Sequence, residues 1–370
     1  MDTKDRIFGF DILRCMAIVF VLLSHSLFLL PFTAITKEYL HVYTGFIGVE
    51  IFFILSGYLV GKIFLQTLQK HSFSFATVKQ FWIRRWFRTL PVYYLGLVLY
   101  AILYYLANHR FYFSTPESFL YLVFLQNFVS PHPDFFVQAW TLSVEEWFYL
   151  LLPGWAFVGC WFFKKQNKAM LSAIIGVIIL ITLLRLVKVY NYDPDWSFGV
   201  RMLVPLRLDS LMTGVLAAYL HLHYEKRWQQ YASQIFIAGI LILICCSGWF
   251  LLDITPNPVK AGFFSKILLF NFFSIGIACL MPYMSGIRKA GNLFIGKIVT
   301  HTSLISYSLY ILHTLCIFVF ITLYNKLFSQ DILLVKFIGS WISFFIAATI
   351  MYRYYEKPFT NLRERRRKNN

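Results

Sequence analysis

The chain alternates long apolar runs with short polar segments over almost its whole length. A helix that crosses the ~30 Å hydrocarbon core of a bilayer needs about 20 apolar residues. The runs that meet this length number ten, and they cover residues 8–31, 44–66, 89–107, 144–163, 169–189, 205–222, 234–252, 266–285, 304–325 and 332–352. A further apolar piece, residues 118–129, is too short to cross and is expected to lie in or re-enter the membrane. The pattern therefore predicts an all-α, polytopic transmembrane bundle.

The composition supports the same fold class. Of the 370 residues 59% are hydrophobic and only 14% are charged, whereas soluble domains carry roughly 25% charged residues. A soluble globular protein, a disordered chain and a disulfide-stapled secreted domain are therefore excluded. The six cysteines lie in or beside apolar runs without a Cys-x-x-Cys pair, so they are expected to be small core residues. The first apolar run contains Asp11, Arg14 and His25, which is typical of a retained span and not of a signal peptide.

The charge distribution predicts how the chain is oriented. The net charge is +17, and the basic residues lie mainly in the loops between apolar runs. With both termini inside, the inner segments hold 22 Lys and Arg residues against 5 in the outer loops. Because cytoplasmic loops are enriched in positive charge, both termini are predicted to be cytoplasmic. Residues 1–356 would form one membrane domain and residues 357–370 a basic cytoplasmic tail.

The first predicted span carries ionisable side chains, which are functional candidates when they lie inside a membrane. Arg14 and His25 are eleven residues apart, so they share one helical face and lie ~16 Å apart along the axis. Arg14 is expected toward the cytoplasm, where Asp11 could pair with it, and His25 toward the outside. The alternatives are that Arg14 reaches the inner headgroups and that His25 only bonds a neighbouring helix.

Three glutamates stand out at the outer side of later spans. Glu50 is predicted near the depth of His25, where a carboxylate could orient the imidazole; pairing with some other cation is the alternative. Before the fourth span, Ser143 and Glu146 have the spacing of a capping box. Glu146 therefore has a structural explanation, and Glu145 is the functional candidate of the two.

Basic and small residues give further patterns. Arg85 and Arg88 share a helical face, and their guanidinium groups suit phosphate oxygens; the alternative is anchoring of an amphipathic helix at the inner surface. The spacing of Gly57 and Gly61 favours close helix packing. Other polar positions are weaker candidates for function. Arg207 and Asp209 are expected to form a membrane-edge ion pair. Ser306, Tyr310 and His313 share one helical face and either line a cavity or link helices.

Six short motifs follow one another in a familiar order. They are Arg14-x10-His25, Gly48-Val-Glu50-x-Phe-Phe-x-x-Ser56-Gly57, Arg85-x-x-Arg88 with Pro91, Trp140-Thr-Leu-Ser-Val-Glu145-x-x-Phe-Tyr149, Ser306-Tyr307-x-x-Tyr310-x-x-His313, and Glu356-x-Pro358. Over nearly its whole length the chain resembles the acyltransferase-3 family of bacterial membrane O-acyltransferases. It has Glu50 where many members have Asp, and Thr141 where Ser is usual; both replacements keep the chemistry.

The resemblance implies an enzyme of the bacterial cytoplasmic (inner) membrane. Such an enzyme transfers an acyl group, usually acetyl, from cytoplasmic acyl-coenzyme A to sugar hydroxyls. The acceptors are surface or exported glycans such as lipopolysaccharide O-antigen, peptidoglycan or oligosaccharides. Some members carry a C-terminal esterase-like domain, which this chain is expected to lack because it stops soon after its last span.

The residues and the resemblance together give an expected mechanism. Arg85 and Arg88, with Arg14 deeper, would bind the phosphates or the pantetheine neck of acyl-coenzyme A. His25 would be the general base or would itself be acylated, with Glu50 or Glu145 orienting it. No metal and no permanently bound cofactor are expected, because the thioester is already activated. Two other hypotheses stay open: a transporter or flippase of a glycolipid or small solute, and a structural subunit without chemistry of its own.

Overall fold

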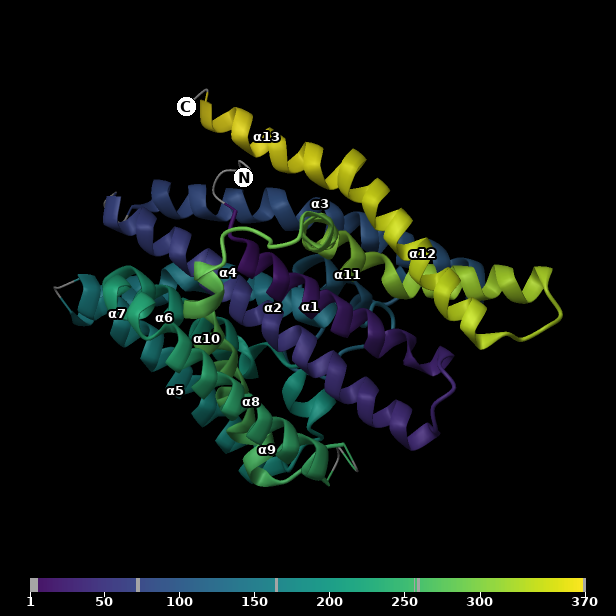
Figure 1. Ribbon diagram of the computed structural model, residues 1–370, viewed down its shortest axis with the longest axis horizontal. Coiled ribbons are helices and arrows are strands. Elements are labelled where there is room, and N and C mark those ends of the chain that lie inside the picture. The colour runs from purple at the N-terminus through teal and green to yellow at the C-terminus, as the bar shows by residue number, and fades with distance from the viewer. Residues whose placement is uncertain (1–5, 71–73, 164–165, 256, 258–259, 369–370) are drawn as a thin grey trace.

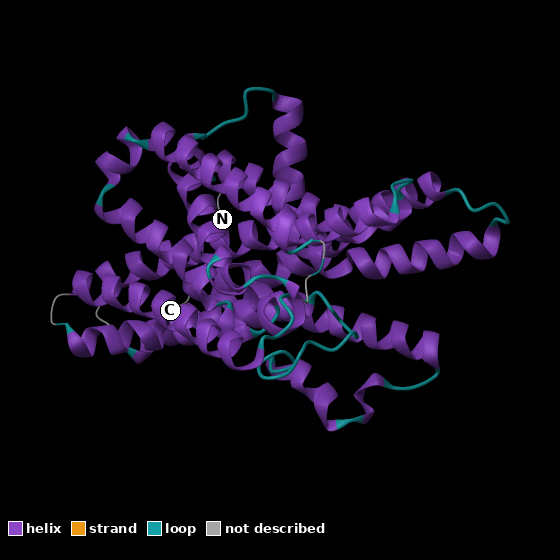
Figure 2. Cartoon of the chain, turned by 90° about the horizontal axis from the view of Figure 1, so that it is seen from below, coloured by secondary structure: helices purple, strands orange, loops and turns teal. Residues whose placement is uncertain are grey.

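The structure is a computed structural model that describes residues 6–70, 74–163, 166–255, 257 and 260–368. Within these residues the regular elements are all helices, and Figure 2 shows them linked by loops without a strand. The predicted all-α fold is confirmed. Lys4, Lys164 and Lys165, which contributed to the charge count, lie outside the described residues, as do the last two positions of the basic tail.

Most of the helices follow one another with short connections, but 30 residues separate α3 from α4. They are α1 (Phe8–Ser26), α2 (Ala34–Lys70), α3 (Phe75–Asn108), α4 (Ala139–Phe162), α5 (Gln166–Tyr192), α6 (Leu208–His223), α7 (Glu225–Gln230), α8 (Ala232–Asp253), α9 (Phe263–Ile267), α10 (Leu269–Gly286), α11 (Leu293–Leu327), α12 (Leu333–Met351) and α13 (Lys357–Lys368). In Figure 1, α1 and α2 run between a group formed by α5 to α10 and a group formed by α3 and α11 to α13. The short apolar piece is not a span: it holds the 3-10 helix η4 (Pro116–Val123).

Eight helices in the described part of the chain are long and apolar enough to cross a membrane. They contain α1, α2, α3, α5, α8, α10, α11 and α12, and they match eight of the predicted spans. The two other predicted spans are also helical, as α4 and α6, although α6 has only 16 residues. Figure 1 shows the beginning of α1 and the end of α13 at the same end of the bundle, as expected for an even number of crossings. The count of ten and the cytoplasmic side of the termini stay predictions.

Three helices, α2, α3 and α11, begin ten or more residues before their predicted spans. The helix α2 begins at Ala34, ten residues before the expected start, so Glu50 lies ~24 Å along its axis from that end. The helix α3 begins at Phe75 and runs through Pro91 without a break. Arg85 and Arg88 therefore belong to a long helix of the bundle and not to a separate surface helix.

The contact between α2 and α6 depends on glycine. A Cβ atom on Gly57 would lie 2.0 Å from the carbonyl oxygen of Leu211, and one on Gly214 would lie 2.3 Å from that of Ile54. Each helix backbone thus occupies the space that a side chain of the other would need. The close packing predicted from Gly57 and Gly61 is confirmed, and it fixes α6 against the centre of α2.

We expect Gly57→Ala to destabilise the protein, because the new methyl group would overlap a backbone atom that cannot move alone. Overpacking of this kind costs ~1–3 kcal/mol. Gly154→Ala is the matched control, since no atom lies within 4 Å of the position of its Cβ, and alanine there favours the helix. Thermal unfolding of both variants in detergent measures the difference. Equal unfolding midpoints would contradict the close contact of α2 with α6.

Candidate functional site

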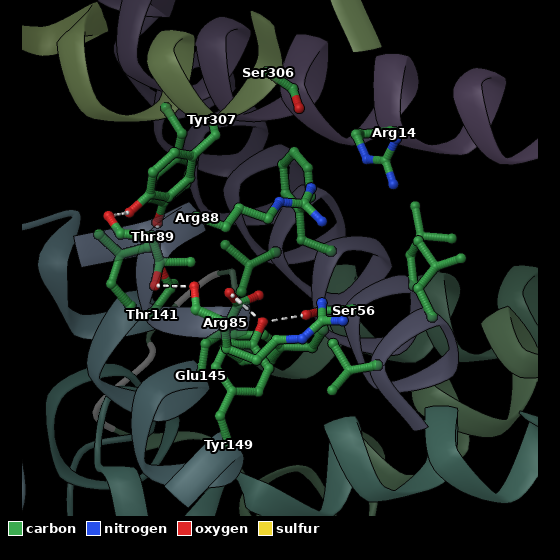
Figure 3. Close-up of a pocket in the computed structure, with 18 residues that line it drawn as sticks. Arg14, Ser56, Arg85, Arg88, Thr89, Thr141, Glu145, Tyr149, Ser306 and Tyr307 are labelled. Carbon is green, nitrogen blue, oxygen red and sulfur yellow. Dashed lines mark hydrogen bonds between the residues drawn. The ribbon is translucent and has the colours of Figure 1, made fainter. Parts of the chain in front are cut away.

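A cavity opens between α1, α2, α3, α4 and α11 (Figure 3). It has a volume of about 870 Å³ including its open mouth. Its lining consists of Arg14, Val49, Phe52, Phe53, Leu55, Ser56, Leu59, Val60, Arg85, Arg88, Thr89, Thr141, Leu142, Glu145, Tyr149, Ser306, Tyr307 and Tyr310. Four of the six candidate residues, Arg14, Arg85, Arg88 and Glu145, are therefore brought together, although they come from three separate helices.

The cavity is electropositive. Figure 3 shows Arg85 and Arg88 entering it from α3 and Arg14 from α1. The Nη1 atom of Arg14 donates to Ser303 Oγ at 3.0 Å and lies 3.6 Å from Asp11 Oδ1, so the predicted Asp11–Arg14 pair is confirmed. Arg6 shares the same carboxylate, with Nε 2.5 Å from Oδ2 of Asp11. With three arginines and Glu145 in its lining, the cavity favours an anionic ligand.

Glu145 is held inside the cavity by a chain of hydroxyl groups. The hydroxyl of Tyr149 donates to its Oε2 at 3.0 Å and lies 2.7 Å from Ser56 Oγ. A second link, at 2.6 Å, joins Thr141 on α4 to Tyr310 on α11. Ser56, Thr141 and Tyr149 belong to the sequence motifs but were not named there as site residues. The one sequence signal that could have identified them is a hydroxyl group inside an apolar run.

The expectation that Glu146 caps a helix is wrong. The helix α4 begins at Ala139, so Ser143 lies in its second turn, where its Oγ donates to the carbonyl of Ala139 at 3.2 Å. Glu146 is buried and accepts a hydrogen bond from Thr89 Oγ1 at 2.6 Å, while the carbonyl of Thr89 accepts one from Tyr307 at 2.9 Å. Glu146 therefore links α4 to α3 behind the cavity wall.

Glu50 does not contact His25. Its carboxylate pairs with the Nη2 atom of Arg207 and accepts from Ser210 Oγ at 3.1 Å, and both members of the ion pair are fully buried. The alternative interpretation, pairing with another cation, is the one that the structure shows. The expected pair between Arg207 and Asp209 is wrong, because Asp209 instead pairs with Arg185 at 2.7 Å. Arg207, just before α6, and Asp209, in its first turn, thus pair with two different helices, α2 and α5.

His25 lies beside the cavity and not in its lining. Its Nδ1 atom is 2.9 Å from the carbonyl oxygen of Val21, and since a carbonyl only accepts, Nδ1 carries the proton and Nε2 the lone pair. The ring packs against His313 at a centroid distance of 4.8 Å and against His41 at 5.8 Å. The ring centroid of Tyr310, which lines the cavity, is 6.0 Å from that of His313. Apart from Glu50, the candidate residues therefore lie either in the cavity or in a histidine cluster formed by His25, His41 and His313, and the two adjoin at Tyr310.

Comparisons with known proteins agree with the motifs. A family model described as an acyltransferase domain, that of the acyltransferase-3 family, matches residues 7–352. The peptidoglycan O-acetyltransferase OatA of Listeria monocytogenes is 35% identical over 152 residues, which is 37% of this chain and 23% of that protein. A Staphylococcus aureus protein whose name provisionally assigns it O-acetyltransferase activity is 25% identical over 373 residues, 95% of this chain and 57% of its own length.

The relatives are longer than the region that matches. The match covers 57% of the length of the Staphylococcus aureus protein and 23% of that of the Listeria protein. No solved structure matches it significantly. The family match, by contrast, covers every element from α1 to α12 and includes all the candidate residues. The chain belongs to the acyltransferase-3 family.

Proposed function

We propose that the protein is a membrane O-acyltransferase that moves an acetyl group from cytoplasmic acyl-coenzyme A to a hydroxyl of a surface or exported glycan. The observation that carries this proposal is the cavity with three arginines and a carboxylate, whose Tyr310 adjoins the contacting pair of His313 and His25. The names of the relatives favour acetyl as the group and peptidoglycan, rather than lipopolysaccharide, as the class of acceptor. The bacterial cytoplasmic membrane is the proposed location.

The cavity suits a donor with a charged head and a thin apolar arm. Phosphate groups do not enter lipid, whereas guanidinium groups bind them with charge-assisted hydrogen bonds. Arg85 and Arg88 would hold the phosphates or the pantetheine neck, with Arg14 further along. The remaining lining includes the apolar side chains of Val49, Leu55, Leu59, Val60 and Leu142. The thioester end would then reach toward Tyr310 and the histidines behind it.

His25 is the proposed general base. Its Nε2 lone pair takes the proton of the acceptor hydroxyl while that oxygen attacks the thioester carbonyl carbon. The carbonyl π electrons move to oxygen, and when they return the C–S bond breaks. The leaving sulfur recovers the proton from His25, so the products are an ester and free coenzyme A. Glu145 lies on the side of Tyr310 where the donor would bind. Glu50 pairs with Arg207 and not with His25.

Purified protein in detergent, supplied with labelled acetyl-coenzyme A and muropeptides, tests the proposed function. We expect free coenzyme A and acetylated glycan to form in equal amounts, and glycans from cells with the gene to be heavier by acetyl groups. The rival hypothesis of a transporter or flippase predicts no thioester cleavage. It would be supported by movement of a glycolipid across vesicles that contain the purified protein but no acetyl-coenzyme A.

Arg85→Ala and Arg88→Ala are expected to raise the KM for acetyl-coenzyme A much more than they lower kcat. The phosphates do not change during transfer, so their binding is uniform in ground and transition states. A lost charge-assisted hydrogen bond is worth roughly 1.5–3 kcal/mol, or about 10- to 150-fold in affinity. Arg110→Ala, a change of an exposed loop cation, is the control for net charge. An equal rise in KM for Arg110→Ala would show that the effect is not local.

Glu145→Gln and Glu146→Gln are expected to differ. Gln at 146 still accepts the hydrogen bond of Thr89, so this variant should keep its fold and most activity, with about 1 kcal/mol or less lost. Gln at 145 removes the negative charge from the cavity lining, and most activity should disappear while the thermal midpoint stays unchanged. Activity and thermal unfolding of the two variants are compared side by side. Equal loss of activity from both would reverse the assignment.

A further inference from the structure

His313 occupies the most buried position of the histidine cluster. It lies on α11, its exposed fraction is 0%, and its ring meets that of His25 at an interplanar angle of 67°. Its Nδ1 atom is 3.1 Å from the carbonyl oxygen of Leu309, which places the proton on Nδ1 and the lone pair on Nε2. That buried Nε2 has no hydrogen-bond partner among the described residues.

A buried acceptor without a donor requires a physical reason, because it costs roughly 1–3 kcal/mol. The neighbouring ring supplies one. His25 has the same tautomer as His313, so neither Nε2 carries a proton in the resting state and no hydrogen bond can join them. Once His25 gains a proton on Nε2, it becomes a donor. The two rings are in contact, with 4.8 Å between their centroids and an interplanar angle of 67°, so the Nε2 lone pair of His313 is a neighbouring acceptor for a protonated His25.

We propose that His313 is the positioning partner of His25 and shares the proton that His25 takes from the acceptor hydroxyl. The inference rests on the proposed acyl transfer. During the step the O–H bond breaks, the proton moves to Nε2 of His25, and a hydrogen bond to Nε2 of His313 holds it there. When the C–S bond breaks, the proton returns to the sulfur, so both imidazoles end neutral. His313 thus takes the role that the sequence pattern assigned to Glu50 or Glu145.

The other groups around His25 and His313 are either exposed or have their polar atoms engaged elsewhere. His41 faces His25 from α2 and is exposed, and its Nδ1 is 2.8 Å from the carbonyl oxygen of Ser24. Arg201 interacts with His25 electrostatically but stacks over Trp140, with 5.1 Å between its guanidinium carbon and the ring centre. Tyr310 faces His313 and donates to the carbonyl of Gln138 at 3.2 Å. Among the groups that face His25, His313 is the buried neutral one with an open lone pair.

The variant His313→Phe tests the proposal, because phenylalanine keeps a ring of similar size and removes the lone pair. His223→Phe is a matched control. His223, on α6, also has Nδ1 beside the carbonyl oxygen four residues earlier, at 3.0 Å, and a buried Nε2 without a partner in the described part of the chain. Its ring stacks on Tyr219 instead of another imidazole. Both variants should fold, which thermal unfolding in detergent checks.

Steady-state acetyl transfer from acetyl-coenzyme A is measured from low to high pH. We expect His313→Phe to lower kcat by more than about tenfold, less than loss of the base itself. The acidic limb of kcat/KM should move to lower pH, because the proton on His25 loses its acceptor. His223→Phe should match wild type in both respects. Reduced kcat with an unmoved acidic limb would indicate a structural role, and unchanged kcat would remove any role; both overturn the proposal.

A second measurement does not depend on turnover. Histidine-selective ¹⁵N NMR of the full-length protein should show His25 and His313 titrating as a coupled pair in two macroscopic steps, reduced to one step in His313→Phe. Independent titration of the two rings would overturn the proposal. Wild-type protein that transfers no acetyl group would overturn the proposed function and this inference with it. Active wild type with an unaltered His313→Phe variant would overturn the inference alone.

Discussion

Replacing His25 by alanine is expected to leave coenzyme A binding nearly intact and to lower kcat by ~10²–10⁴-fold, the usual loss for a general base. The structural reason is that His25 and the arginines lie in separate parts of the site. The arginines line the cavity, whereas His25 is not part of the lining and contacts His313, which in turn adjoins Tyr310. Calorimetric titration with coenzyme A, followed by steady-state kinetics on the same preparation, measures the two quantities independently.

His25→Gln is the control for shape. Glutamine can keep the hydrogen bond to the carbonyl of Val21, but an amide does not accept a proton at neutral pH, so this variant should be no more active than His25→Ala. The proposed mechanism predicts opposite behaviour for Arg88→Ala, which should bind coenzyme A weakly and turn over bound donor nearly normally. If His25→Ala abolishes donor binding while Arg85→Ala and Arg88→Ala bind normally, the roles are reversed and the mechanism is wrong.

Features that depend on one stretch of chain were predictable from the sequence. Helical periodicity and apolar length indicated the helices, and the spacing of Asp11, Arg14 and His25 placed all three on α1 as the structure has them. The spacing of Arg85 and Arg88 predicted a shared face, and both enter one cavity. These predictions succeed because a helix fixes the direction of its side chains by backbone geometry alone.

Features that depend on contacts between distant segments were not predictable in this way. Glu50 and Arg207 are separated by 157 positions, and His25 and His313 by 288. The partner of each depends on how far its helix extends and which neighbour it meets. Because α2 begins ten residues early, Glu50 lies deeper than expected, beside α6 and away from the end of α1. In the same way, the early start of α4 moved Ser143 and Glu146 out of a cap and into the helix.

The pair of Glu50 and Arg207 gives the largest expected effect on stability. Glu50→Ala leaves a guanidinium group that is 0% exposed without its carboxylate, and breaking a buried pair from one side typically costs about 3–5 kcal/mol. Asp331→Ala is the control, because its pair with Lys336 has a carboxylate that is 70% exposed, and exposed pairs contribute about 1 kcal/mol or less. Unfolding in mixed micelles with increasing denaturing detergent measures both variants.

Replacing both partners separates stability from chemistry. In Glu50→Leu/Arg207→Leu no charge is left unpaired, and apolar replacement of a whole buried pair is often neutral or stabilising. We therefore expect the double variant to recover most of the stability lost in Glu50→Ala. Since neither side chain lines the cavity, it should also retain acetyl transfer. A stable double variant without activity would contradict a purely structural role for Glu50 and return this residue to the catalytic group, as the sequence pattern first indicated.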